Sequence, residues 1–128
     1  MARQNISSGA KWENIVGYSR AVRIGPLIEV AGTTAAKDGE VLHKGDPYSQ
    51  AKAIIDIASK ALQEAGAALS DVVRTTVYLK DINDWKEVGR AHGEAFKDIK
   101  PASTMLQVSA FVDADMLVEI EFTAYLSK

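Results

Sequence analysis

The chain has 128 residues, 47% apolar and 25% charged, and this balance predicts one globular domain over 1–128 rather than a disordered chain. The 15 basic and 17 acidic residues give a formal net charge of −2 without a basic block, so a nucleic-acid partner is not expected. The absence of cysteine excludes disulfides, thiolate nucleophiles and cysteine-ligated metals, and it is compatible with the cytoplasmic location that we expect.

The first seventeen residues are polar, and we predict a leader at 1–17 that becomes ordered only by packing on the rest of the domain. It lacks the apolar core of a signal peptide. No apolar run in the chain approaches the roughly 20 residues that a membrane span needs. We therefore expect no membrane partner.

The first half of the chain is predicted to form two strands and a helix. The strands lie at 19–24 and 27–32, joined by a Gly-Pro turn, and a loop at 33–44 holds a brief strand at 40–42. Asp46 suits the N-cap of a helix and Pro47 its first position. Apolar residues then recur at helical spacing until Gly66 ends the helix.

The second half is predicted to form a strand, a helix and two more strands. The strands lie at 73–80, 103–110 and 116–126. The helix between the first two has a buried stripe that includes Trp85, Val88, His92, Ala95 and Phe96. The last strand is the most regular element, because apolar residues alternate with other residues along all of 116–126.

Two helices can cover only one face of such a sheet, and the apolar face is the one we expect them to cover. The other face is predicted to mix polar and apolar side chains: Arg74, Thr76, Tyr78, Ser103, Met105, Gln107, Leu117, Glu119, Thr123 and Tyr125. This mixture indicates a surface that meets another subunit and leaves polar clefts at the seam. The alternative is a solvated face with a few stray apolar residues.

Glu119 is the strongest candidate for chemistry on that face. A carboxylate on a central strand is partly desolvated, which raises its pKa and makes it a usable proton donor or acceptor near neutral pH. The alternative is that Glu119 or Glu121 pairs with Arg74 across the sheet. No metal site is expected, because neither His43 nor His92 has a second ligand at suitable spacing. From these residues alone, the prediction is an α/β or α+β domain that forms oligomers.

The chain carries four motifs in this order: RTTVYLKD at 74–81, NDW at 83–85, PAS at 101–103 and VEIE at 118–121. Together they resemble the successive motifs of the Rid/YjgF family of reactive-intermediate imine deaminases. The resemblance covers about 17–126. It implies an α+β, chorismate-mutase-like fold with a single sheet and two helices on one face. It also implies a homotrimer whose sheets form a central β-barrel, with three clefts between the subunits.

For the active members, the family resemblance implies hydrolysis of 2-imino or 2-enamino acids to 2-oxo acids and ammonia without a cofactor. Glu119 aligns with the carboxylate that positions or activates water, and Tyr18 and Gly32 align with residues that line the cleft. Ser103 and Met105 follow Pro-Ala in the third motif and are expected to contact a small-molecule ligand in the intersubunit cleft.

Ser103 is also the main departure from the family, since active deaminases carry Arg there to clamp the substrate carboxylate. Losing a buried charge-assisted pair costs about 2–5 kcal/mol, which would abolish useful affinity for a small imino acid. Three readings stay open. The first is a hydrolase with an altered substrate: either the substrate is neutral or less anionic, or Arg20, Arg23 or Arg74 replaces the missing clamp. The second is a non-catalytic trimeric binder of a small metabolite, and the third and weakest is an endoribonuclease.

Overall fold

The computed structural model describes residues 2–127. The strands are β1 (Arg3–Ile6), β2 (Ala21–Ile24), β3 (Leu27–Thr33), β4 (Ala36–Lys37), β5 (Glu40–Val41), β6 (Val72–Leu79), β7 (Ala102–Gln107) and β8 (Val118–Tyr125). The helices are α1 (Pro47–Glu64) and α2 (Trp85–Phe96), with short turns η1 (Glu13–Gly17), η2 (Leu69–Asp71) and η3 (Ile82–Asp84).

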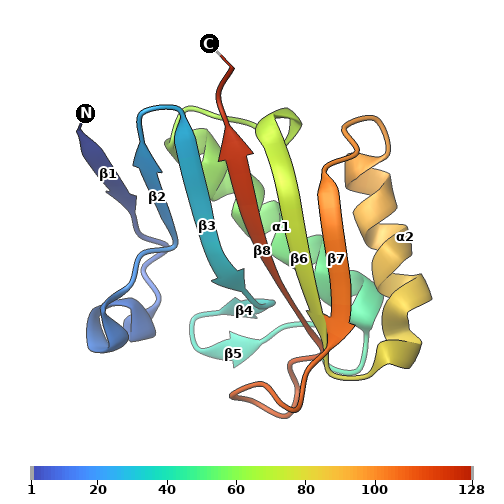
Figure 1. The fold of residues 1–128 in the computed structure, drawn as a ribbon. Helices are drawn as coiled ribbons and strands as arrows, with labels where there is room; N and C mark the ends of the chain where they lie inside the picture. Colours follow the sequence, from blue (N-terminus) through green and yellow to red (C-terminus); the bar gives the residue numbers. More distant parts are fainter. Residues whose placement is uncertain (1, 128) are drawn as a thin grey trace.

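Six of the strands form one sheet in the order β1-β2-β3-β8-β6-β7, and both helices lie on the same face of it (Figure 1). All neighbouring strands are antiparallel except β6 and β7, which run parallel and are connected through α2. The predicted α+β fold, a single sheet with two helices on one face, is therefore confirmed. The predicted strand at 40–42 belongs to a separate two-stranded ribbon, β4-β5.

The alternation predicted for the last strand is confirmed along β8. Val118, Ile120, Phe122 and Ala124 are at most 1% exposed and pack into the core beneath the helices. Fully burying a large apolar side chain contributes about 1.5–3 kcal/mol, so this strand is a main source of stability. Because side chains alternate along a strand, Glu119, Glu121 and Thr123 lie on the opposite, uncovered face.

The helix boundaries agree with the predicted caps. Asp46 accepts a hydrogen bond from the Ser49 N–H at 3.0 Å, and Gly66 has a φ of 88°, which favours glycine after a helix end. Val88 and Phe96 are buried as predicted, but Trp85 is 53% exposed. Trp85 is the first residue of α2, and helical side chains point back toward the N-terminus, so its ring projects beyond the helix instead of onto the sheet.

The leader contributes a strand that the sequence pattern does not predict. β1 pairs with β2 and forms an edge of the sheet, and Ile6 is buried there. The segment has no apolar alternation, so only its backbone pairing with β2 makes it a strand.

Candidate functional site

Glu119 lies near the start of β8 and is only partly exposed on the uncovered face of the sheet, opposite Tyr78 of β6. Burial raises the pKa of its carboxyl group, the charge of Arg20 acts against this, and the neighbouring Glu121 raises it further. The net shift is upward, which agrees with the desolvation predicted from the sequence. A carboxylate in this environment is a stronger base than one in water.

Gly32 makes the space that Glu119 occupies. The pairing between β3 and β8 shifts register between Val30 and Thr33, and Gly32 lies within this irregularity. A Cβ atom on Gly32 would lie 2.5 Å from Glu119 Oε2, closer than real Cβ contacts. The absence of a side chain at this position therefore allows the carboxylate to lie directly against the β3 backbone.

Arg20 lies next to this pair and is only 7% exposed. Its Nη1 donates to the Gly32 carbonyl oxygen at 2.9 Å and to Thr33 Oγ1 at 2.8 Å. Its guanidinium lies 5.5 Å from the centre of the Tyr18 ring, within the range of a cation–π interaction. Arg20 thus connects the β3 irregularity to the segment that carries Tyr18.

Tyr18 is held in place by the leader. Its N–H donates to the Glu13 carbonyl oxygen at 3.0 Å, which closes the turn η1. The buried Glu13 carboxylate accepts from the Ser8 N–H at 3.1 Å and the Ser8 hydroxyl at 2.5 Å. Burial alone would raise the pKa of Glu13, but hydrogen bonds from Ser8 and Ser7 outweigh it and lower the pKa. An ionised Glu13 therefore orders the leader around the site.

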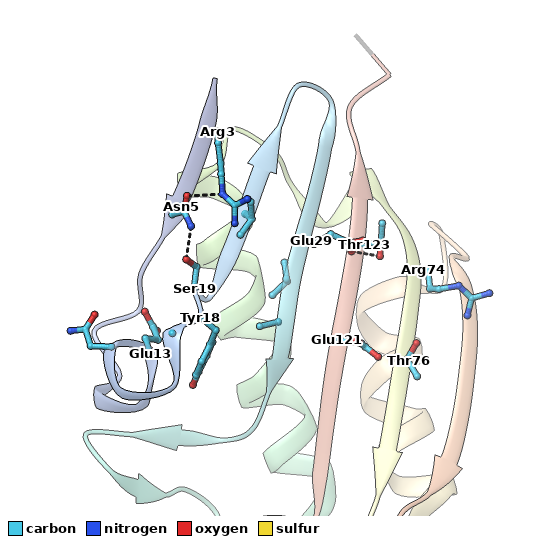
Figure 2. A pocket seen from close by; sticks show the side chains of 15 residues that line it. Arg3, Asn5, Glu13, Tyr18, Ser19, Glu29, Arg74, Thr76, Glu121 and Thr123 are labelled. Atoms are coloured by element: carbon cyan, nitrogen blue, oxygen red, sulfur yellow. Dashed lines mark hydrogen bonds between the residues drawn. The ribbon is translucent and has the colours of Figure 1, made fainter. Parts of the chain in front are cut away.

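Two hollows meet at Tyr18 and Ala31. The larger has a volume of about 2320 Å³, and Tyr18, Arg20, Gly32 and Glu119 line it together with loop residues such as Phe111. The smaller, about 790 Å³, lies over the sheet face (Figure 2). The structure thus brings Glu119, Tyr18 and Gly32 into one cavity of the protomer, while the roles that the resemblance implies for them stay predictions.

Hydrogen bonds between strands occupy several side chains of the uncovered sheet face. The Tyr78 hydroxyl group donates a hydrogen bond to the Glu121 carboxylate, and this hydrogen bond raises the pKa of Tyr78. Thr123 donates to Glu29 at 2.5 Å, a contact visible in Figure 2. Arg74 donates to Thr104, and no ion pair within residues 2–127 joins it to Glu119 or Glu121. The alternative of an Arg74 ion pair across the sheet is therefore wrong.

The predicted orientation of Ser103 and Met105 is also wrong. The parallel register pairs Ser103 with Thr75 and Met105 with Val77, so both side chains lie on the helix-covered face. Met105 packs against the core, and Ser103 Oγ lies 2.8 Å from Thr75 Oγ1. The β7 sequence is ambiguous because both of its faces mix polar and apolar residues, and only the pairing with β6 decides between them.

A hydrogen-bonded chain continues from Ser103 to α2. Thr75 Oγ1 also lies 2.8 Å from His92 Nε2, and burial lowers the pKa of His92. Within this protomer, Ser103 and Met105 are therefore remote from Glu119, on the other face and two strands away. Their predicted contact with a ligand is not tested by this arrangement.

Gln50 is a positioning residue that is missing from the sequence-based predictions. It is fully buried on α1, where its Nε2 donates to the carbonyl oxygens of Leu42 at 3.1 Å and Asp115 at 2.9 Å. Its Oε1 accepts from the Leu117 N–H at 2.9 Å. These contacts fix the residues that lead directly into Glu119. The one sequence signal for this role is that Gln50 is a polar residue on the apolar side of α1.

Within residues 2–127, no group of three or more His, Asp or Glu side chains is arranged to hold a metal ion. None of the helices described here is both long and apolar enough to cross a membrane.

Comparison with known proteins decides the family. A family model described as endoribonuclease L-PSP matches residues 9–126. The chain belongs to the Rid/YjgF family. A solved structure from Mycobacterium tuberculosis, described as a member of the highly conserved YjgF family, has 46% sequence identity and a TM-score of 0.89, covering 98% of this chain and 100% of that one.

Two Rid/YjgF relatives bear on function. An uncharacterized protein of Streptomyces coelicolor is 41% identical over 124 residues, which cover 97% of this chain and 92% of the relative. The 3-aminoacrylate deaminase RutC of Acinetobacter baylyi is more distant, with 27% identity over 110 residues, covering 85% of this chain and 86% of RutC. The family therefore includes a protein named for removing an amino group from an enamine.

Proposed function

We propose that the chain is a cofactor-independent hydrolase of small enamines or imines, acting in the cytoplasm, in which Glu119 positions and activates a water molecule. The observation that carries this proposal is the partly buried Glu119 carboxylate, with a raised pKa, at the wall of a cavity beside Gly32. The name of the distant deaminase relative supports the same reaction class.

The proposed reaction needs only one group that accepts and returns a proton. As the water oxygen bonds to the imine carbon, Glu119 takes a proton from the water. Returning that proton to the nitrogen gives a carbinolamine. Glu119 then takes the remaining hydroxyl proton and passes it to the nitrogen as the C–N bond breaks, which releases ammonia and leaves a C=O group. The raised pKa suits both transfers, because it makes Glu119 a better base and a better acid near neutral pH than an ordinary carboxyl group.

We further propose that three copies of the chain close a barrel through the uncovered sheet faces and bind a small-molecule ligand in the clefts between them. The partly exposed face with Arg74, Thr76, Glu121 and Thr123 supports this, since it is neither a core nor an ordinary solvated surface. A neighbouring copy would exclude water from Glu119. Mass measurement in solution tests the trimer, and a monomer would contradict it.

The activity is tested with imines generated in place by an amino acid oxidase, scoring the release of 2-oxo acid and ammonia. Glu119→Gln is expected to abolish turnover while the oligomer stays intact. Glu29→Gln, which changes another carboxylate of the same sheet face, is the matched control because Glu29 does not contribute to the pKa shift of Glu119. Rates equal to wild type in Glu119→Gln would remove Glu119 from the mechanism.

The second candidate is a non-catalytic trimer that holds a small metabolite in the same cleft. The residue at 103 favours it, because Ser103 Oγ accepts a hydrogen bond from Thr75 and supplies none of the positive charge of the Arg in active deaminases. Ligand binding without turnover would decide for this candidate. Endoribonuclease activity is weaker still, since Glu29, Glu119 and Glu121 place negative charge on the face that would meet phosphates.

A further inference from the structure

Arg20 has hydrogen-bonding capacity that the protein does not use. Nη1 is fully engaged by Gly32 and Thr33. Nε is buried and has no partner among the described residues, and no hydrogen bond within residues 2–127 involves Nη2. An unpaired donor in a buried charged group is energetically costly, so its presence needs an explanation.

The two unused nitrogens belong to the same edge of the guanidinium. The N–H of Nε and one N–H of Nη2 point in the same direction and form a fork that matches the two oxygens of a carboxylate. The hydrogen bonds of Nη1 to Gly32 and Thr33 hold the group from its other end. The protein therefore orients the guanidinium but leaves its carboxylate-binding edge without a partner.

The nearby carboxylate of Glu119 does not fill this edge. Within residues 2–127, Arg20 and Glu119 form no ion pair with an N···O distance of 4.0 Å or less, although both line the same cavity. Opposite charges that share a partly buried cavity attract strongly. Both groups nevertheless line the cavity without forming an ion pair with each other.

We infer that Arg20 binds the carboxylate of a short-chain organic acid through Nε and Nη2 and presents the adjacent carbon to Glu119. This inference rests on the proposed function for the role of Glu119, but the binding itself does not. The ligand class is a small monocarboxylate whose carbon next to the carboxylate carries the C=N or C=O group. Arg20, which directly precedes β2, thus supplies the positive charge that is missing at position 103.

The wild-type protein provides a direct test by NMR of its arginine Nε–H signals, with pyruvate as the probe. The Arg20 signal is expected to shift downfield as pyruvate binds. The uncharged analogue pyruvamide is expected to cause no such shift. An Arg20 signal that pyruvate leaves unchanged, or equal binding of the two compounds, would overturn the inference.

A variant pair tests the same point. Arg20→Lys keeps the charge but has no fork, and it is expected to weaken pyruvate binding about ten- to hundredfold, as for loss of hydrogen bonds to a charged group. Arg23→Lys is the control, because Arg23 Nε and Nη1 are already bound to the carbonyl oxygens of Gly25 and Ala65. Unchanged pyruvate affinity in Arg20→Lys would refute the assignment even if that variant were less stable.

The two proposals fail in different ways. Pyruvate binding at Arg20 without turnover of any imine would overturn the proposed hydrolase and leave the binding site intact. Turnover with an unchanged KM in Arg20→Lys would overturn the binding site and leave the hydrolase intact. Glu119→Gln is expected to retain pyruvate binding while it loses turnover.

Discussion

Adding a single methyl group at Gly32 is expected to displace the Glu119 carboxylate without unfolding the protein. In Gly32→Ala, the new Cβ would lie 2.5 Å from Oε2, 3.1 Å from Cδ and 3.5 Å from Cγ of Glu119. Ordinary contacts begin about 1 Å beyond the shortest of these, so the carboxylate must move by about 1 Å. The backbone at Gly32 does not adopt a positive φ, so alanine introduces no backbone strain there.

A displacement of about 1 Å in a catalytic group costs roughly 100-fold in rate, and we expect that loss in kcat for Gly32→Ala. The carboxylate is the end of a flexible side chain, so the Tm should stay close to that of the wild type. Imine turnover measures the first effect. A ¹³C titration of the Glu119 carboxyl group reports its altered environment independently of any substrate.

Gly89→Ala is the matched control, since a Cβ at that position would meet nothing within 4 Å. It lies inside α2 and should raise stability by up to about 1 kcal/mol without changing turnover. Wild-type kcat and an unshifted Glu119 titration in Gly32→Ala would refute the argument that Gly32 sets the position of the carboxylate.

Three further predictions follow from the site and its support. The raised pKa of Glu119 means that its ionised form destabilises the folded state, so Glu119→Gln should raise the Tm at pH 8. This gain should shrink as the pH falls and vanish well below the ordinary carboxyl pKa of 4.5, where the group is protonated in both the folded and the unfolded state. An equal gain at high and low pH would contradict the desolvation. Gln50→Leu leaves buried backbone groups near Leu42 and Leu117 unpaired and should lower stability by about 2 kcal/mol or more, measured by urea unfolding, whereas an exposed control such as Gln63→Leu should change it little. Ser103→Arg should leave the pyruvate affinity, measured by calorimetry, nearly unchanged because Arg20 already supplies the positive charge. A large increase in pyruvate affinity would instead show that the wild-type site has no group that binds the carboxylate.

Periodicity in the sequence determined the main elements and the layer arrangement. The strict alternation in β8 and the capped helical pattern of α1 admit one interpretation each, because one face of each element is apolar throughout. The motifs also determined the family, and the desolvated position of Glu119 followed from its place on the central strand.

Tertiary structure decided what depends on pairing between distant segments. β1 is a strand only through its backbone bonds to β2, and the parallel pairing with β6 turns Ser103 and Met105 toward the helices. Likewise, the unpaired edge of Arg20 arises where β2, the irregular part of β3 and the leader meet. A sequence shows that an arginine is present, but only the three-dimensional arrangement shows which of its donors are already satisfied.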